Sequence, residues 1–227
     1  MNLEKKAISG YLQRKKLLAK GIPIRVTSFG DGFKNRVYYV SASGQSWIVK
    51  QAHSRAQLKE RWWLDRKRIF AEKSCIEVLA QFLAPEIIPE VVLEDRTDFI
   101  LVTTPPPHNS SCWESELANG RIDLQIAVQC GELLATVHNE TAGIPEIKSM
   151  FKDTKAFEQL RIDPHYNFIV QTYPDLKKAI ANRSNRLLKE NICLTLGDLR
   201  PRNVWVNNGQ LYLVDFATAH YGNPTFD

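Results

Sequence analysis

The chain has 227 residues, 44% hydrophobic and 24% charged, a composition that is ordinary for a folded globular protein and excludes a disordered or fibrous one. No run of about 18 apolar residues is present and the charged N-terminus lacks the apolar stretch of a signal peptide, so we expect neither a membrane-spanning helix nor a secretory leader. The net charge of +5 fits an anionic partner, either a nucleic acid or a small anion such as a nucleotide, and the four scattered cysteines predict free thiols in a cytoplasmic protein.

Strand-like runs dominate the N-terminal part of the chain. After a short charged helix, three runs of β-branched and aromatic residues are separated by the turn signals Gly30-Asp31-Gly32 and Ser43-Gly44, which predicts three antiparallel strands. A stretch with apolar residues at helical spacing and two further strand-like runs follow. The predicted elements are a helix over 2–20, strands over 24–29, 36–42 and 46–52, a helix over 55–83, and strands over 89–96 and 98–104.

The densest basic run is KERWWLDRKR, at the beginning of the predicted helix. Its two tryptophans, Trp62 and Trp63, could stack on nucleic-acid bases. However, Glu60 and Asp65 interrupt the positive charge, so we favour the start of an amphipathic helix with a solvated basic face. We therefore expect no nucleic-acid partner and no membrane partner.

The sequence changes character after PPPHNSS at 105–111, a stretch that is typical of a linker. Helical patterns follow, and Asn207-Asn208-Gly209 between two short apolar runs predicts a hairpin. We therefore predict an α+β fold with two lobes, an antiparallel sheet with one helix and a mainly helical lobe, and a ligand between them. The predicted segments are helices over 121–139, 157–162 and 172–191, an N-terminal lobe over 1–103, a hinge over 104–111 and a C-terminal lobe over 112–227.

One motif of the second lobe, LGDLRPRN followed by LYLVDF, brings three oxygen-bearing side chains together. Asp198 and Asn203 are five residues apart on a loop that Pro201 keeps from forming a regular helix, and Asp215 ends the returning strand. Each residue alone would be an ordinary turn or strand-end residue. Together they match a phosphoryl-transfer site, in which Asp198 accepts a hydroxyl proton and Asn203 and Asp215 hold Mg²⁺.

The stretch LGDLRPRNVWV…LYLVDFATAHYGNPTFD resembles the signature of the aminoglycoside phosphotransferase and choline kinase group of small-molecule kinases. GDLRPRN is also similar to the catalytic loop of protein kinases. The resemblance implies a protein-kinase-like fold and Mg²⁺-dependent transfer of the γ-phosphate of ATP to a hydroxyl of a sugar, an aminoglycoside or an amino alcohol. Within the group, GDGFKNRVYYV, WIVKQA and RWWLDRKRIFAE most resemble the methylthioribose kinases.

The resemblance implies a nucleotide-binding role for the N-terminal lobe. Gly30 and Gly32 would let the backbone approach phosphates, and Lys50 on the third strand would contact the α- and β-phosphates. Glu72 is the favoured ion-pair partner of Lys50, and Glu77 is the competitor. Backbone groups of Val102 to Thr104 on the hinge strand would pair with adenine.

The sequence departs from the family pattern at three positions near the motif. Leu196 and Arg200 replace histidines, and Ala217 replaces an acidic residue of the methylthioribose kinases. We expect Leu196 to fill the space of a mainly structural histidine. For Arg200 two roles stay open, a catalytic contact to phosphate oxygens and an ion pair with a nearby carboxylate.

The family pattern continues past Asp227 with helices that form the wall of the acceptor site. The sequence therefore predicts either a truncated C-terminal lobe or an unusually short family member. Asp227 normally holds the catalytic loop in such proteins. A catalytically silent nucleotide-binding or regulatory module is the alternative to an active kinase, and the oligomeric state is not predicted.

Overall fold

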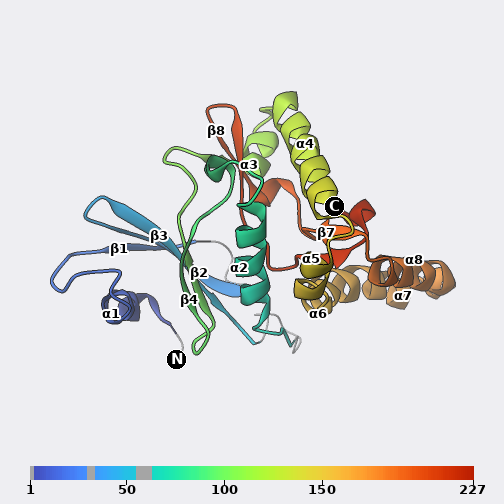
Figure 1. The fold of residues 1–227 in the computed structure, drawn as a ribbon, viewed down its shortest axis with the longest axis horizontal. Coiled ribbons are helices and arrows are strands. Elements are labelled where there is room, and N and C mark those ends of the chain that lie inside the picture. Colours follow the sequence, from blue (N-terminus) through green and yellow to red (C-terminus); the bar gives the residue numbers. More distant parts are fainter. Residues whose placement is uncertain (1–2, 30–33, 55–62) are drawn as a thin grey trace.

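The computed structural model describes residues 3–29, 34–54 and 63–227. Figure 1 shows a β-sheet in one lobe and a group of helices in the other, with helix α2 between them. The expected α+β fold, with an antiparallel sheet and a mainly helical second lobe, is confirmed. No helix in the described ranges is both long and apolar enough to cross a membrane. The four cysteines carry free thiols.

A five-stranded sheet with the order β1-β2-β3-β5-β4 forms the N-terminal lobe, and every neighbouring pair in it is antiparallel. β3 lies in the middle, with Ile48 opposite Thr103 and Lys50 opposite Leu101 of β5. The register therefore places Lys50 two residues away from the point where β5 meets the predicted hinge. The strands are β1 (Arg25–Ser28), β2 (Asn35–Ala42), β3 (Gln45–Ala52), β4 (Val91–Asp95) and β5 (Ile100–Thr103).

The two faces of this sheet contact different helices, because successive side chains of a strand point to opposite faces. Val102 is buried in a cluster with Tyr11 of α1 (Ile8–Arg14). Its neighbour Leu101 belongs to a second cluster that includes α2 (Arg68–Leu79) and extends into the C-terminal lobe. The second cluster thus holds the two lobes together through shared apolar contacts.

The C-terminal lobe is mostly helical and is built around α4 (Leu124–Thr141), which packs on β7 and β9. The Asp123 carboxylate caps α4 by accepting a hydrogen bond from the Gln125 amide at 2.9 Å. The other α-helices are α3 (Trp113–Ala118), α5 (Pro145–Met150), α6 (Lys155–Phe157), α7 (Phe168–Thr172) and α8 (Lys177–Lys189), and a π-helix spans Glu158–Asn167. Short 3₁₀ turns span Lys5–Ala7, Pro85–Ile87, Pro174–Leu176, Pro201–Asn203 and Pro224–Phe226.

Two small sheets carry the polar motif of this lobe. The predicted hairpin is present, with Asn207 paired to Gln210 on either side of a two-residue turn. The turn residues Asn208 and Gly209 both have positive φ, 49° and 76°, as such a tight turn requires. The first small sheet has the order β6-β8-β9, and the second pairs β10 with β7. The strands are β6 (Ser111–Cys112), β7 (Cys193–Thr195), β8 (Val204–Asn207), β9 (Gln210–Leu213) and β10 (His220–Gly222).

Two predicted helices are shorter than expected. The N-terminal helix ends near Lys16, whose φ of 61° is left-handed and stops helical hydrogen bonding. In the second helix, residues 55–62 lie outside the described residues and α2 begins only at Arg68. The Asp65 carboxylate accepts a hydrogen bond from the Lys67 amide at 2.9 Å, which favours a turn instead of a continuous helix before Arg68.

The expected solvated basic face at the start of α2 is wrong for Arg68. Its side chain is buried and donates to the carbonyls of His53, Asp65 and Lys34 and to the side chain of Asn35. The Arg68 guanidinium therefore has a structural role, because its donors are occupied by these acceptors and it is not accessible to a nucleic acid. Arg68 therefore anchors the beginning of β2 to α2.

Candidate active site

A cavity of about 440 Å³ lies where the two lobes meet, a size that suits a small organic ligand. Its walls come from β2, β3, α2 and the end of β5 in one lobe, and from the loop and strands of the polar motif in the other. The lining residues are Phe29, Lys34, Asn35, Val37, Ile48, Lys50, Glu72, Pro89, Thr103, Thr104, Pro106, Arg200, Arg202, Asn203, Trp205, Val214 and Asp215.

Lys50 lies between two carboxylates in this cavity. Its Nζ atom is 2.6 Å from Glu72 Oε1 on α2 and 3.2 Å from Asp215 Oδ1 after β9. The structure thus brings Lys50 and Glu72 together, whereas Glu77 pairs with Lys73 at 2.6 Å. The ion pairs join the sheet, α2 and the C-terminal motif in one cluster.

The opposite charges in this cluster shift the pKa values of its members. Burial opposes the charge on Lys50, but Asp215 and Glu72 more than offset it and raise the pKa of the ammonium group. Burial also acts to raise the pKa of Asp215, but Lys50 and Lys34 hold it well below its usual range. For Glu72, burial raises the pKa and Lys50 offsets only part of that effect. Asp215 is therefore ionised at neutral pH and offers a carboxylate to a cation.

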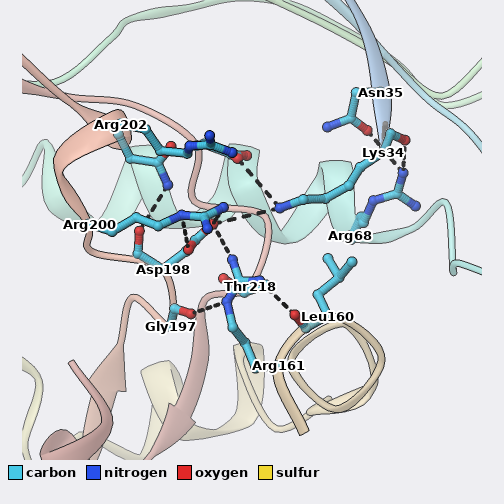
Figure 2. A network of polar contacts seen from close by, with 12 residues as sticks. Lys34, Asn35, Arg68, Leu160, Arg161, Gly197, Asp198, Arg200, Arg202 and Thr218 are labelled. Atoms are coloured by element: carbon cyan, nitrogen blue, oxygen red, sulfur yellow. Dashed lines mark hydrogen bonds and ion pairs between the residues drawn. The ribbon is translucent and has the colours of Figure 1, made fainter. Parts of the chain in front are cut away.

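Three cationic side chains surround the buried carboxylate of Asp198, as Figure 2 shows. Arg161 forms an ion pair with Oδ2, Arg200 Nε lies 2.9 Å from Oδ1, and Lys34 Nζ lies 3.6 Å from Oδ2. Arg200 Nη2 also donates to Oδ2 at 3.4 Å. Arg200 and Lys34 line the cavity, so their charges can also reach a bound anion. The predicted ion pair of Arg200 is thus present, with Asp198 as its partner. From the same position Arg200 could also contact a phosphate bound in the cavity.

The loop around Asp198 is held by backbone hydrogen bonds. The Asp227 carboxylate accepts from the Leu196 amide at 2.8 Å and from the Gly197 amide at 2.7 Å. Asn203 Nδ2 donates to the Asp198 carbonyl at 2.9 Å. These contacts fix the direction in which the Asp198 side chain leaves the loop, and they place Asp227 in the loop-holding position that the family pattern implies.

Gly197 is required in this loop for two reasons. Its φ is 75°, and a Cβ atom there would lie 2.7 Å from the carbonyl oxygen of Thr218. We expect Gly197→Ala to lower the free energy of unfolding by about 1–2 kcal/mol from the backbone conformation and by a further ~1–3 kcal/mol from overpacking. Gly209→Ala is the matched control, because Gly209 has φ 76° and open space around it. Urea unfolding measures both, and equal losses would contradict the close contact with Thr218.

Asn203 and Asp215 offer oxygen atoms to the same cavity. Asn203 uses its Nδ2 group for Asp198, and its Oδ1 accepts no hydrogen bond in the part of the chain that the structure describes. The Asn203 carbonyl accepts from the Val214 amide at 3.0 Å, which ties the loop to the end of β9. Asp215 itself has φ 67°, a left-handed conformation that Asp tolerates better than most residues. The two side chains fit the hard oxygen ligands of Mg²⁺.

Of the remaining predicted site residues that the structure describes, only Thr104 is found at the cavity. Gly30 and Gly32 lie outside the described residues. Val102 is fully buried in the sheet and does not line the cavity, whereas Thr104 does. The Thr104 amide already donates to the Glu90 carbonyl at 3.0 Å. The cavity is therefore lined by the last residue of β5, Thr103, and by Thr104 after it, and not by Val102.

Sequence reasoning missed two cations and an aromatic contact in this site. Lys34 precedes β2 and is held by the contacts of Arg68 to its carbonyl, a tertiary feature without a local signal. Arg161 lies in the π-helix. The sequence predicted only that this segment is helical and gave no indication that Arg161 reaches the site. Phe29 and Trp205 stack with ring centroids 5.4 Å apart and form one wall of the cavity.

Leu196 and His220 behave as core residues. Leu196 is buried in the apolar cluster that also contains Phe216 and Ala219. His220 is buried and stacks on Phe157 with centroids 4.1 Å apart. Neither side chain lines the cavity.

Comparison with known families and proteins gives a consistent result. The sequence profile described as "Phosphotransferase enzyme family" (APH) matches residues 25–227. Methylthioribose kinase of Pectobacterium atrosepticum is 27% identical over 234 residues, covering 90% of this chain and 58% of that protein. The chain thus spans less than two thirds of the length of this curated relative.

Solved structures share the fold at low sequence identity. The complex of gentamicin with APH(2″)-IIa has a TM-score of 0.62 and 18% identity, covering 100% of this chain and 74% of that chain. Spectinomycin phosphotransferase APH(9)-Ia with ADP and spectinomycin has a TM-score of 0.60 and 14% identity, covering 100% and 73%. A choline/ethanolamine kinase family protein from Mesorhizobium loti has a TM-score of 0.59 and 16% identity, covering 95% and 67%.

Proposed function

The chain belongs to the phosphotransferase enzyme family, and from this membership we propose that it transfers the γ-phosphate of ATP to a hydroxyl group of a small molecule. The sugars, aminoglycosides and amino alcohols are the proposed acceptor classes. The observation that carries the proposal is the meeting of Lys50, Asn203 and Asp215 in one cavity, beside the buried carboxylate of Asp198.

Asp198 is proposed as the general base. Its carboxylate accepts the proton of the acceptor hydroxyl as that oxygen forms a bond to the γ-phosphorus, while the bond from the γ-phosphorus to the β–γ bridging oxygen breaks and ADP leaves. Arg161 holds this carboxylate from the side of the π-helix and does not line the cavity. Arg161 can therefore keep the Asp198 carboxylate oriented while Lys34 and Arg200 contact the phosphates of the nucleotide.

The cavity cations are proposed to position the phosphates. Lys50, held by Glu72, would contact the α- and β-phosphates, because its ammonium group is buried at the centre of the cluster. Lys34 and Arg200 line the cavity next to Asp198 and would contact the transferred group. Arg200 can offer two parallel N–H groups to phosphate oxygens.

Asn203 and Asp215 are proposed to hold Mg²⁺, which when bound neutralises charge on the β- and γ-phosphates. In the described residues no group of three or more His, Cys, Asp or Glu side chains is placed to hold a metal ion. Mg²⁺ is usually bound by one or two carboxylates together with substrate phosphates, which is the donor set available here. Metal binding is therefore expected to depend on the nucleotide.

Named relatives support the acceptor classes. A curated relative is a methylthioribose kinase. One solved structure of the same fold contains gentamicin, and another contains ADP and spectinomycin. Because these proteins differ in acceptor on one scaffold, the class of small hydroxyl compounds is proposed and no single acceptor is chosen.

Nucleotide binding and turnover test the proposal together. With MgATP at 100 times Kd, the free energy of unfolding should rise by about 2.7 kcal/mol, seen as a higher Tm. A panel of methylthioribose, choline, ethanolamine and aminoglycosides should contain an acceptor that raises ADP release. Stabilisation without turnover on any acceptor would favour the silent nucleotide-binding module, and no stabilisation would contradict both readings.

Arg161 is expected to act as a positioning residue through Asp198. Its Nε donates to the Gly197 carbonyl at 3.0 Å while Nη2 pairs with Asp198. Arg161→Met should therefore lower kcat by about 10–100-fold through misplacement of the base, with the KM for ATP within twofold. Arg161→Lys should restore part of kcat by keeping the charge.

The control for this pair of variants is Arg186→Met, at an exposed arginine that pairs with Glu190. It should leave both constants unchanged. A purely structural role of Arg161 would instead lower Tm and change kcat and KM together, without rescue by lysine.

A further inference from the structure

Lys34 connects the sheet of the N-terminal lobe to the polar motif of the other lobe. Its backbone carbonyl accepts hydrogen bonds from the His53 amide at 3.2 Å and from the Arg68 guanidinium, which fixes the backbone beside the end of β3 and the beginning of α2. From there the side chain points toward the Asp198 carboxylate, as Figure 2 shows. Only 16% of the side chain is exposed, so the ammonium group is held inside the site.

The ammonium group of Lys34 lies between the proposed base and the proposed metal ligand. Its Nζ atom is 3.6 Å from Asp198 Oδ2 and 4.0 Å from Asp215 Oδ2. The other oxygen of Asp215, Oδ1, lies 3.2 Å from Lys50 Nζ. Each oxygen of the Asp215 carboxylate thus faces an ammonium group.

These ammonium groups oppose the binding of a metal ion by Asp215. Mg²⁺ binds through carboxylate oxygens, and a positive charge about 4 Å from such an oxygen repels a metal ion bound to it. Burial acts to raise the pKa of Asp215, but Lys50 and Lys34 hold that pKa well below its usual range. Lys34 therefore already acts as a counter-ion of Asp215, a role that a bound metal ion would otherwise take.

The two lysines differ in how they are held. Lys50 has another carboxylate partner, Glu72 Oε1 at 2.6 Å, which keeps its ammonium group in place when Asp215 binds a metal ion. Among the residues that the structure describes, Lys34 pairs with no carboxylate other than Asp198 and Asp215. Its flexible stem lets the ammonium group turn to another anion while the backbone stays fixed. Because Lys34 lines the cavity, the phosphates of a bound nucleotide would be such anions.

We propose that Lys34 is a built-in counter-ion of Asp198 and Asp215 that opposes Mg²⁺ binding to the protein without nucleotide. The phosphates of the nucleotide draw the ammonium group away from both carboxylates. The metal ligand and the base then become available only together with the phosphate donor. The inference rests on the proposed function, because it concerns the metal pair and the base of that same site.

Binding of Mn²⁺ to the protein without nucleotide tests this proposal. Mn²⁺ prefers the same oxygen ligands as Mg²⁺, and electron paramagnetic resonance measures its binding directly. Lys34→Met should lower the Kd for Mn²⁺ by at least about fivefold, the effect of one unit charge about 4 Å away even in water. Lys34→Arg keeps the charge and should bind Mn²⁺ as weakly as the wild-type protein. Asp215→Asn in the Lys34→Met protein should remove the gain.

Lys73→Met is the matched control for Lys34→Met. Lys73 also pairs with two carboxylates, Glu77 at 2.6 Å and Glu94 at 3.9 Å, but it does not line the cavity. Its removal changes the net charge by the same amount and should leave the Kd for Mn²⁺ at the wild-type value. The same gain in Lys73→Met would show that any lost positive charge favours Mn²⁺, and it would overturn the assignment to Lys34.

An unchanged Kd for Mn²⁺ in Lys34→Met would overturn the proposal, and a gain that persists after Asp215→Asn would place the metal on other ligands. The wild-type protein gives a test that needs no variant, because AMP-PNP should lower its Kd for Mn²⁺. Equal Mn²⁺ affinity with and without bound AMP-PNP would overturn the proposal and leave nucleotide binding established. No binding of AMP-PNP in calorimetric titration would overturn the proposed function and, with it, this inference.

Discussion

Asp198→Asn is expected to lower kcat by about 10²–10⁴-fold, the usual contribution of a positioned general base. Asparagine keeps the shape of the side chain but cannot accept the hydroxyl proton. MgATP should bind as well as before or more tightly, because Lys34 and Arg200 would lose a competing carboxylate. Steady-state kinetics with a productive acceptor and calorimetric titration with AMP-PNP and Mg²⁺ measure the two effects separately.

Asp175→Asn is the control for this change, because Asp175 is exposed in a 3₁₀ turn of the C-terminal lobe. It should retain full activity. Near-native turnover of Asp198→Asn would show that another group takes the proton. A loss of MgATP binding together with turnover would instead place Asp198 among the nucleotide-binding groups.

Asp215→Asn should have the second large effect. Its carboxylate is ionised and lies against Lys50, and it is the only negatively charged member of the proposed metal pair. An amide is a weaker ligand for a hard cation, and a metal supplies several kcal/mol of transition-state stabilisation. We expect turnover to fall by about 10²–10³-fold. The Mg²⁺ concentration that gives half-maximal nucleotide binding should rise by at least about tenfold.

Asp95→Asn provides a matched buried aspartate outside the cavity, since Asp95 pairs with Lys15 at 2.8 Å. That variant should lose stability and keep its Mg²⁺ dependence. If Asp215→Asn also kept the wild-type Mg²⁺ dependence, the metal would have to be held elsewhere.

The strands and the hairpin could be predicted from the sequence because their signals are local. The runs that form β2, β3 and β5 alternate or are bounded by turn residues, and Asn208-Gly209 forms the expected turn. The resemblance to the aminoglycoside phosphotransferase and choline kinase group is confirmed by the family match over residues 25–227. The lobe boundaries at 1–103, 104–111 and 112–227 stay a prediction.

The start of α2 could not be predicted from periodicity alone. Apolar residues at helical spacing continue upstream of Arg68, but the Asp65 side chain forms a local hydrogen bond to the Lys67 amide that competes with the helix. The burial of Arg68 depends on the carbonyls of His53 and Lys34, which are distant in sequence. A local pattern contains no information on such partners.

The cations around Asp198 were missed for the same reason. Arg161 reaches Asp198 from a π-helix that contains Pro164, which lacks the N–H of a regular helical turn. Lys34 reaches it from the other lobe, so that contact exists only when the two lobes are in place. The polar motif itself could be predicted because Asp198, Asn203 and Asp215 lie within one hairpin and its loop.

A crystal structure of the protein with AMP-PNP and Mg²⁺ would show whether the cavity between the lobes is the active site. We expect the analogue to occupy this cavity, with its phosphates at Lys50 and a metal ion bound by Asn203 Oδ1 and Asp215. The γ-phosphate should face the Asp198 carboxylate. A nucleotide bound elsewhere, or phosphates in the cavity without a metal at Asn203 and Asp215, would show that the proposed site is wrong.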